Sequence, residues 1–237
     1  MTRLDGTTAP ASQTLSRGIR ILEVLADARG PLSIDEIAQR LEVHRSVAYR
    51  LLRTLEDHGL VERDAAGRIE LGARLAALAA GVAHDLQAEA LPELTAVAGD
   101  LGATCFLAVL DHEECVTLSS VEPRHAVNPV AQRPGTRHPI TRGAPGKAIL
   151  SLLPTSSWPA DVAPELAAQV TDAATRGYAT SHDEVIPSLR AVAVPLVVRG
   201  RGPAAIAVVF VASAHSDEEI AARLIRSASA IREALGG

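Results

Sequence analysis

The sequence of 237 residues lacks long apolar runs, and none comes near the roughly 18 residues that a transmembrane helix needs. Its first residues, MTRLDGTTAPASQT, are polar and contain no apolar segment typical of a signal peptide. We therefore expect a cytoplasmic protein with no membrane partner.

Cysteine and aromatic residues are scarce. Two cysteines, Cys105 and Cys115, can form neither a disulfide framework nor a four-ligand zinc site, and we expect both in the core. Aromatic residues make up 2% of the chain, which disfavours proteins that bind single-stranded nucleic acid by stacking. The histidines are scattered and form no H-x-x-x-H pair. We expect no metal and no cofactor.

Motifs of common enzymes are also missing. Residues 143–148 resemble a phosphate-binding loop only superficially, because Thr141 stands in place of its first glycine and Ala148 in place of the hydroxyl that binds Mg²⁺. No G-x-S-x-G nucleophile motif occurs. The polar segment 182–184 contains groups that can act as a general base, but no catalytic constellation surrounds it. We predict that the chain is not an enzyme; a ligand-processing enzyme with a tethered winged helix is the alternative.

The charge that is present is unevenly distributed. The chain carries a net charge of −5, and all of this excess lies after residue 75. Within the neutral first part, residues 43–55 contain Arg45, Arg50 and Arg53 beside His44, and no acid. Such a cationic patch suits docking on phosphate. A solvated helix face is the alternative.

The pattern of the first seventy residues predicts a winged helix-turn-helix. An apolar stripe over 16–26 indicates one helix, and Ser33 with Glu36 forms a capping box that starts a second. After a short turn a third helix runs to Gly59. Two strand-like runs, 60–63 and 68–71, then enclose a turn, which predicts a hairpin wing.

In this fold the start of the third helix enters the DNA major groove. A tri-helical module that binds only proteins is the alternative. The polar face of the third helix, with His44 at its start, supplies candidate groove contacts, and we predict that Arg45, Ser46, Tyr49 and Arg50 reach the bases. Cations and hydroxyls around it are candidates for phosphate contacts: Arg17, Ser33, Arg53, Arg63 and Arg68.

The rest of the chain predicts a connector and a domain of a different class. Residues 72–86 are expected to form one helix, which packs against a partner or within the chain, and 91–101 another with Pro92 in its first turn. From 103 onward, strands and helices alternate irregularly, which predicts an α+β fold with an antiparallel sheet. Strands are expected at 104–110, 115–121, 127–131, 178–180, 191–198 and 204–211, and helices at 143–153, 164–176 and 217–235. The predicted divisions are a DNA-binding domain over 14–72, a linker helix over 73–90 and a second domain over 91–237.

Several ordered motifs make the chain similar to IclR-family transcriptional regulators. They are Ser16–Glu23, Leu32–Ala38, Ser46–Glu56, Gly135–Ile140, Gly146–Leu150, Arg176–Ala179 and Ala191–Pro195. The resemblance implies a winged helix-turn-helix, a linker helix and a GAF-like effector-binding domain. It also implies homodimers or dimers of dimers that bind double-stranded DNA operators and respond to small organic acids or aromatic metabolites.

The same resemblance implies an effector pocket around the loop that opens the Gly-Lys helix. The positions carried over are Ala144, Pro145, Gly146, Ser181, Ala191, Ala207 and Val209, with Glu184 nearby. Free backbone N–H groups at a helix N-terminus attract anions, and the other positions are mostly apolar. We therefore expect an effector with a carboxylate and an apolar body. The stretch 153–176 is shorter than the family usually carries, and we expect Trp158 to act there as a local plug.

Overall fold

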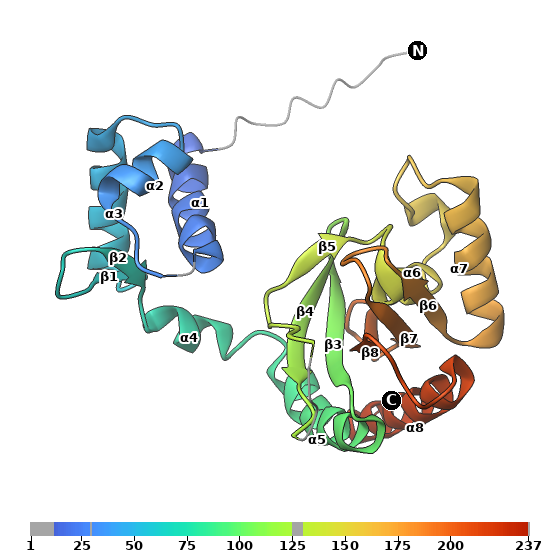
Figure 1. The fold of residues 1–237 in the computed structure, drawn as a ribbon. Helices are drawn as coiled ribbons and strands as arrows, with labels where there is room; N and C mark the ends of the chain where they lie inside the picture. Colours follow the sequence, from blue (N-terminus) through green and yellow to red (C-terminus); the bar gives the residue numbers. More distant parts are fainter. Residues whose placement is uncertain (1–11, 29, 125–129, 237) are drawn as a thin grey trace, which may run out of the picture. The chain divides into compact units, whose positions relative to one another are not determined.

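The computed structural model describes residues 12–28, 30–124 and 130–236, which form two compact units divided after Val82. Figure 1 shows the elements of both units. The first unit contains three helices, a hairpin and a short fourth helix: α1 (Gln13–Asp27), α2 (Ile34–Arg40), α3 (Arg45–Asp57), β1 (Val61–Arg63), β2 (Ile69–Leu71) and α4 (Arg74–Ala79).

Local signals start and end the elements of the first unit. The Ser33 hydroxyl accepts the Glu36 N–H while the Glu36 carboxylate accepts the Ser33 N–H, so the predicted capping box of α2 is present. In the hairpin turn, the Asp64 carboxylate accepts the N–H groups of Ala66 and Arg68. Apolar side chains from all three helices and both strands form one core: Ile21, Leu25, Leu32, Ile37, Leu41, Leu51, Leu52, Leu55, Val61 and Ile69.

The second unit is built on one six-stranded antiparallel sheet in the order β5-β4-β3-β8-β7-β6. Its strands are β3 (Thr104–Asp111), β4 (Glu114–Val121), β5 (Arg137–Pro139), β6 (Ala179–His182), β7 (Arg190–Leu196) and β8 (Ala204–Phe210). Its helices are α5 (His84–Leu101), α6 (Gly143–Leu150), α7 (Pro164–Arg176) and α8 (Asp217–Ala234), with a 3₁₀ turn at Thr155–Ser157. The α+β class and the antiparallel sheet are confirmed.

Alternation along the strands divides the core of the second unit in two. Odd positions of β3, such as Cys105 and Leu107, join a cluster with α5 and α8, whereas Phe106 and Ala108 join one with α6 and α7. Helices therefore cover both faces of the sheet (Figure 1). The α6 face of the sheet is lined largely by alanines of β7 and β8, which leaves room for a helix and a pocket.

Two predicted elements are wrong. The helix expected over 72–86 ends at Ala79, because the chain turns and Ala83 takes a left-handed conformation with φ of 46° before α5 begins. The helix expected over 91–101 starts earlier, and Pro92 lies in its interior. The backbone bond that Pro92 cannot donate would go to Ala88; because Ala88 is exposed, water can solvate that carbonyl.

The strand expected over 127–131 is also wrong in its described part. Val130 and Ala131 are not in a strand, and residues 127–129 lie outside the described residues. The Val130 carbonyl accepts the Thr104 hydroxyl at 2.7 Å instead of joining a ladder. The edge strand beside β4 is β5, six residues further along the chain, where Cys115 pairs with His138.

Candidate nucleic-acid interface and ligand pocket

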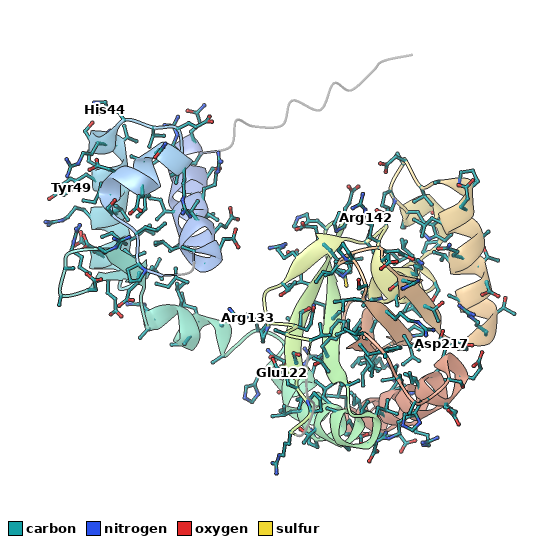
Figure 2. The ribbon with its side chains drawn as sticks, viewed as in Figure 1. His44, Tyr49, Glu122, Arg133, Arg142 and Asp217 are labelled. Atoms are coloured by element: carbon teal, nitrogen blue, oxygen red, sulfur yellow. The ribbon has the colours of Figure 1, made fainter. Side chains whose placement is uncertain are left out.

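Helix α3 has one buried face and one exposed polar face. Its buried side consists of Ala48, Leu51, Leu52 and Leu55, which repeat at helical spacing and anchor it in the core. The exposed residues are those predicted for DNA contact: Arg45, Ser46, Tyr49, Arg50 and Arg53. Figure 2 shows His44 and Tyr49 on the outer side of this helix. The predicted groove contacts therefore share one accessible surface.

The N-terminus of α3 is capped by a histidine. The His44 Nδ1 atom accepts the Ser46 N–H at 3.2 Å and lies 2.8 Å from the Ser46 Oγ atom. An imidazole can accept at Nδ1 only when that nitrogen carries no proton. Arg45 lies beside Asp35 of α2, with 3.2 Å between Nε and Oδ1, and both side chains are exposed. Such an exposed pair contributes little to stability, so Arg45 remains available to an anion.

The arginines of the hairpin are held by acids of the helices. Arg63 forms a fork on Glu56 of α3, with Nη2 at 3.1 Å from Oε2, and this contact raises the Arg63 pKa. Arg68 donates to the Pro31 carbonyl at 2.8 Å and to Glu36 at 3.2 Å. These arginines fasten the hairpin to α3 and α2. Local sequence patterns do not predict this role, because each arginine reaches a partner in another element that only the tertiary structure brings close.

The other residues predicted to contact phosphate differ in whether their side chains already have a partner within the protein. Among the described residues, Arg17, Arg50 and Arg53 are exposed and form no ion pair. Ser33 is engaged in the capping box of α2. A hollow between α3 and the hairpin brings Arg53 and Tyr49 beside the acids Glu56 and Asp57. The free cations of α1 and α3 are therefore the better phosphate candidates.

The second unit has a cavity of about 60 Å³ on the α6 face of the sheet. Strands β3, β7 and β8 form its floor, α6 contributes its first turn, and the segment 183–189 between β6 and β7 closes it. Most of its walls are apolar, with a few hydroxyl, amide, imidazole and charged groups. Its lining residues are Phe106, Gln132, Thr136, His138, Gly143, Pro145, Ser181, Glu184, Val185, Ile186, Leu189, Arg190, Ala191 and Val209.

The predicted effector positions divide into two groups. Five of them line this cavity: Pro145, Ser181, Glu184, Ala191 and Val209. Ala144, Gly146 and Ala207 are buried outside its lining. A Cβ at Gly146 would lie 2.2 Å from the Ile140 carbonyl oxygen, so this glycine permits close packing. His138, Thr136 and Gln132 also line the cavity and were not among the predicted positions. Thr136 and His138 lie in the motif Gly135–Ile140, but with the edge strand expected at 127–131 nothing placed them beside the pocket.

The structure places a carboxylate of the protein at the N-terminus of α6, where an effector anion was predicted. The Gly143 N–H already donates to the Glu184 carboxylate at 2.9 Å, and Pro145 has no N–H. The same carboxylate forms a short ion pair with Lys147, whose ammonium also donates to the Thr180 carbonyl at 3.0 Å. A side chain of the protein itself thus occupies the place expected for an effector anion.

The segment after α6 forms a cap on the core. Trp158 packs against the cluster of the α6 face, and its indole N–H lies 3.2 Å from both the Leu150 and Leu153 carbonyls. These contacts close the C-terminal end of α6, in agreement with the expected local plug. Trp158 does not line the cavity.

No cluster of three or more histidine, cysteine or acidic residues suited to a metal occurs within the described residues. Cys105 and Cys115 are buried and unpaired, and burial raises the pKa of the Cys115 thiol to about 12. No helix in the described part of the chain is long and apolar enough to cross a membrane.

Comparison with known proteins decides the family. The IclR helix-turn-helix domain matches residues 14–65, and the C-terminal domain of bacterial IclR transcriptional regulators matches residues 79–233. The chain belongs to the IclR family. The probable transcriptional regulator SauR of Cupriavidus necator is 32% identical over 211 residues, which cover 81% of this chain and 83% of SauR.

Solved structures agree with this assignment. An IclR transcriptional regulator from Alicyclobacillus acidocaldarius is 28% identical with a TM-score of 0.81, covering 96% of this chain and all of that one. An IclR homologue from Microbacterium hydrocarbonoxydans, solved in complex with 4-hydroxybenzoate, is 25% identical with the same TM-score, covering 94% of this chain and 99% of that one. This IclR-family chain is therefore a DNA-binding transcriptional regulator, and its family is one of regulators rather than enzymes.

Proposed function

We propose that this regulator binds an operator through the exposed face of α3 and is controlled by an organic acid in the α6 cavity. The observation that carries the first part is the cluster of Arg45, Tyr49 and Arg50 on the accessible side of a helix-turn-helix. We assign these side chains and Ser46 to the major groove, with His44 beside them. Arg17 and Arg53 contact phosphates, while Ser33, Arg63 and Arg68 mainly position the module.

The operator is proposed to be palindromic and bound by a homodimer or a dimer of dimers. A dimer places one recognition helix in each half-site. Exposed apolar side chains on α1 and α4 support a contact with a second copy, because Leu15, Ile19 and Leu78 are each about half exposed or more.

The proposed effector has a carboxylate and an apolar body. Phe106, Val185, Leu189 and Val209 surround the cavity with apolar surface. The hydroxyls of Thr136 and Ser181 and the His138 ring, which line the cavity, supply polar contacts for the acid group. A relative solved with 4-hydroxybenzoate supports an aromatic acid as the first probe. The effector changes DNA binding only if its affinity differs between the conformation that binds the operator and the one that does not.

Operator binding is tested with Arg50→Ala. Selection from a random duplex pool with the full-length protein yields the operator, and fluorescence anisotropy then gives the affinity over a range of salt concentrations. We expect Arg50→Ala to weaken specific binding by about 1–3 kcal/mol without changing the melting temperature. Arg226→Ala, an exposed arginine of α8 in the other unit, is the matched control and should bind as the wild type does. Unchanged affinity in Arg50→Ala would remove this residue from the interface, and failure to enrich any duplex would overturn operator binding.

The effector class is tested by thermal shift. Benzoate, 4-hydroxybenzoate, short aliphatic acids and the matching neutral amides are compared on the purified protein. A ligand at 100 times its Kd that binds only the folded state adds about 2.7 kcal/mol of stability. Stabilisation by the acids and not by the amides is expected. Stabilisation by the amides alone would contradict the proposal that the effector carries a carboxylate.

A further inference from the structure

The cavity on the α6 face is too small for the effectors that its walls suit. Its volume of about 60 Å³ is well under the roughly 150 Å³ of an engineered cavity that binds benzene. An aromatic acid therefore needs one wall to move. The floor cannot readily do so, because Phe106, Ala191 and Val209 belong to central strands and are at most 9% exposed.

The wall formed by the segment 183–189, here called the β6–β7 loop, is different. Its apolar side chains Val185 and Ile186 are 45% and 46% exposed although they line the cavity. The bonds from Ser188 N–H to the Asp183 carboxylate and from Leu189 N–H to the Ile186 carbonyl stay within the loop. Such bonds move with the loop and do not hold it against α6.

Glu184 fastens this loop to α6. Its carboxylate accepts the Gly143 N–H at 2.9 Å and pairs with the ammonium of Lys147. Lys147 is 3% exposed, so its charge needs this partner. Its ammonium also donates to the Thr180 carbonyl, which ties α6 to β6 and leaves Glu184 as its contact with the loop. Glu184 itself is 28% exposed and faces the cavity. Among the described residues, the ion pair between Lys147 of α6 and Glu184 is thus the charged contact that holds the loop against α6. It can open because Glu184 can also be solvated by water.

We propose that the Lys147–Glu184 pair is a latch on the β6–β7 loop and that its opening sets the size of effector that the pocket admits. The inference rests on the proposed effector pocket. In the closed state the pocket admits only the smallest acids. An acid with a ring binds when the latch opens and Val185 and Ile186 move outward to cover it. Glu184 is a positioning residue here, because it controls the wall without being the group that holds the effector.

The first test needs no effector. Lys147 is the single lysine of the chain, so acylation by an amine-reactive reagent reports on the latch, with the N-terminal amine as internal reference. We expect Lys147 to react slowly in the wild type and roughly tenfold faster in Glu184→Gln, which keeps the size of the side chain and loses its charge. Glu165→Gln, an exposed acid in the first turn of α7, should react as the wild type does. Equal rates in all three proteins would overturn the latch.

The second test separates a latch from a brace or a ligand contact. Titration calorimetry compares acetate and benzoate on wild type and Glu184→Gln. The latch predicts that benzoate binds roughly tenfold more tightly to the variant, because less of the protein is closed, while acetate is unchanged. If both acids bind the variant more weakly, Glu184 only supports the structure of the pocket. If both bind it more tightly by the same factor, Glu184 simply repels the acid group. Either result overturns the proposal.

Two controls keep these tests decisive. Circular dichroism and urea unfolding establish that the variant is folded, and Glu184→Asp, which shortens the side chain and keeps the charge, replaces it if it is not. If no acid stabilises the wild type in the thermal-shift screen, the proposed effector class has failed. The acylation rates then still decide whether the latch exists.

Discussion

At the scale of single residues, Gly146 shows how one motif can support two different explanations. A glycine before Lys147 at the start of a helix suggested an amide cradle for an anion. The structure gives the glycine a packing role instead, because a Cβ there would lie 2.2 Å from the Ile140 carbonyl oxygen. Backbone atoms of α6 and of the residue after β5 therefore approach more closely than any other residue allows.

We predict that Gly146→Ala lowers the free energy of unfolding of the second unit by about 1–3 kcal/mol, because the backbone must shift to accept the methyl group. Urea unfolding of the full-length protein measures it. Gly99→Ala is the matched control: Gly99 lies in α5 with nothing within 4 Å of its Cβ position. That substitution should raise stability by about 0.5–1 kcal/mol. A neutral Gly146→Ala would show that this packing is not tight in solution.

At the scale of elements, the sequence predicts those helices whose ends carry their own signals. The start of α2 follows from Ser33 and Glu36, and the end of α7 from Gly177. The connector between the units was misjudged because its alanine-rich stretch fits a helix at every position. The turn at Ala83 and the interior Pro92 are set by packing of α5 on the sheet, which local patterns do not encode.

The same distinction applies to the candidate sites. The exposed face of α3 could be predicted, because helical periodicity alone separates Arg50 from Leu51. The hold of Glu56 on Arg63 and of Glu184 on Lys147 could not, since each joins elements that only tertiary structure brings together. The residues that share one helix face can therefore be predicted from the sequence, whereas side-chain pairs that join different elements cannot.

The capping box of α2 predicts a pH dependence of the first unit. Hydrogen bonds from Ser33 lower the pKa of the Glu36 carboxyl below its ordinary value of 4.5, with Arg68 adding to the effect. A lowered folded pKa means that this contribution to stability is complete above 4.5 and is lost as the pH falls through the lowered value. We expect the melting temperature of the first unit to fall over this range, and less so in Glu36→Gln.

Thermal unfolding followed between roughly pH 5 and pH 3 measures this effect. Glu23→Gln is the control, because Glu23 is exposed on α1 and forms no ion pair among the described residues. It should leave the pH profile unchanged. Identical profiles for the wild type and Glu36→Gln would show that the cap does not contribute in solution.

At the scale of the whole molecule, the two units have separate hydrophobic cores. The ten-residue core of the first unit lies between Ile21 and Ile69, and both clusters of the second begin at or after Leu86. A ligand raises the stability of the part that it binds. The two proposed ligands, operator DNA and an acid, should therefore act on different cores.

We predict two transitions in differential scanning calorimetry of the full-length protein, each assigned by a variant. Gly146→Ala should lower the transition of the second unit, and Glu36→Gln should alter the acid sensitivity of the other. Benzoate should then raise only the transition temperature of the second unit, which Gly146→Ala lowers. The selected operator duplex should raise only that of the first unit, which Glu36→Gln alters. A single transition that both ligands raise would show that the two cores unfold as one cooperative structure. In that case a ligand that stabilises one unit also stabilises the other, because the two unfold together. The acid could then change DNA binding without a separate conformational switch between the units.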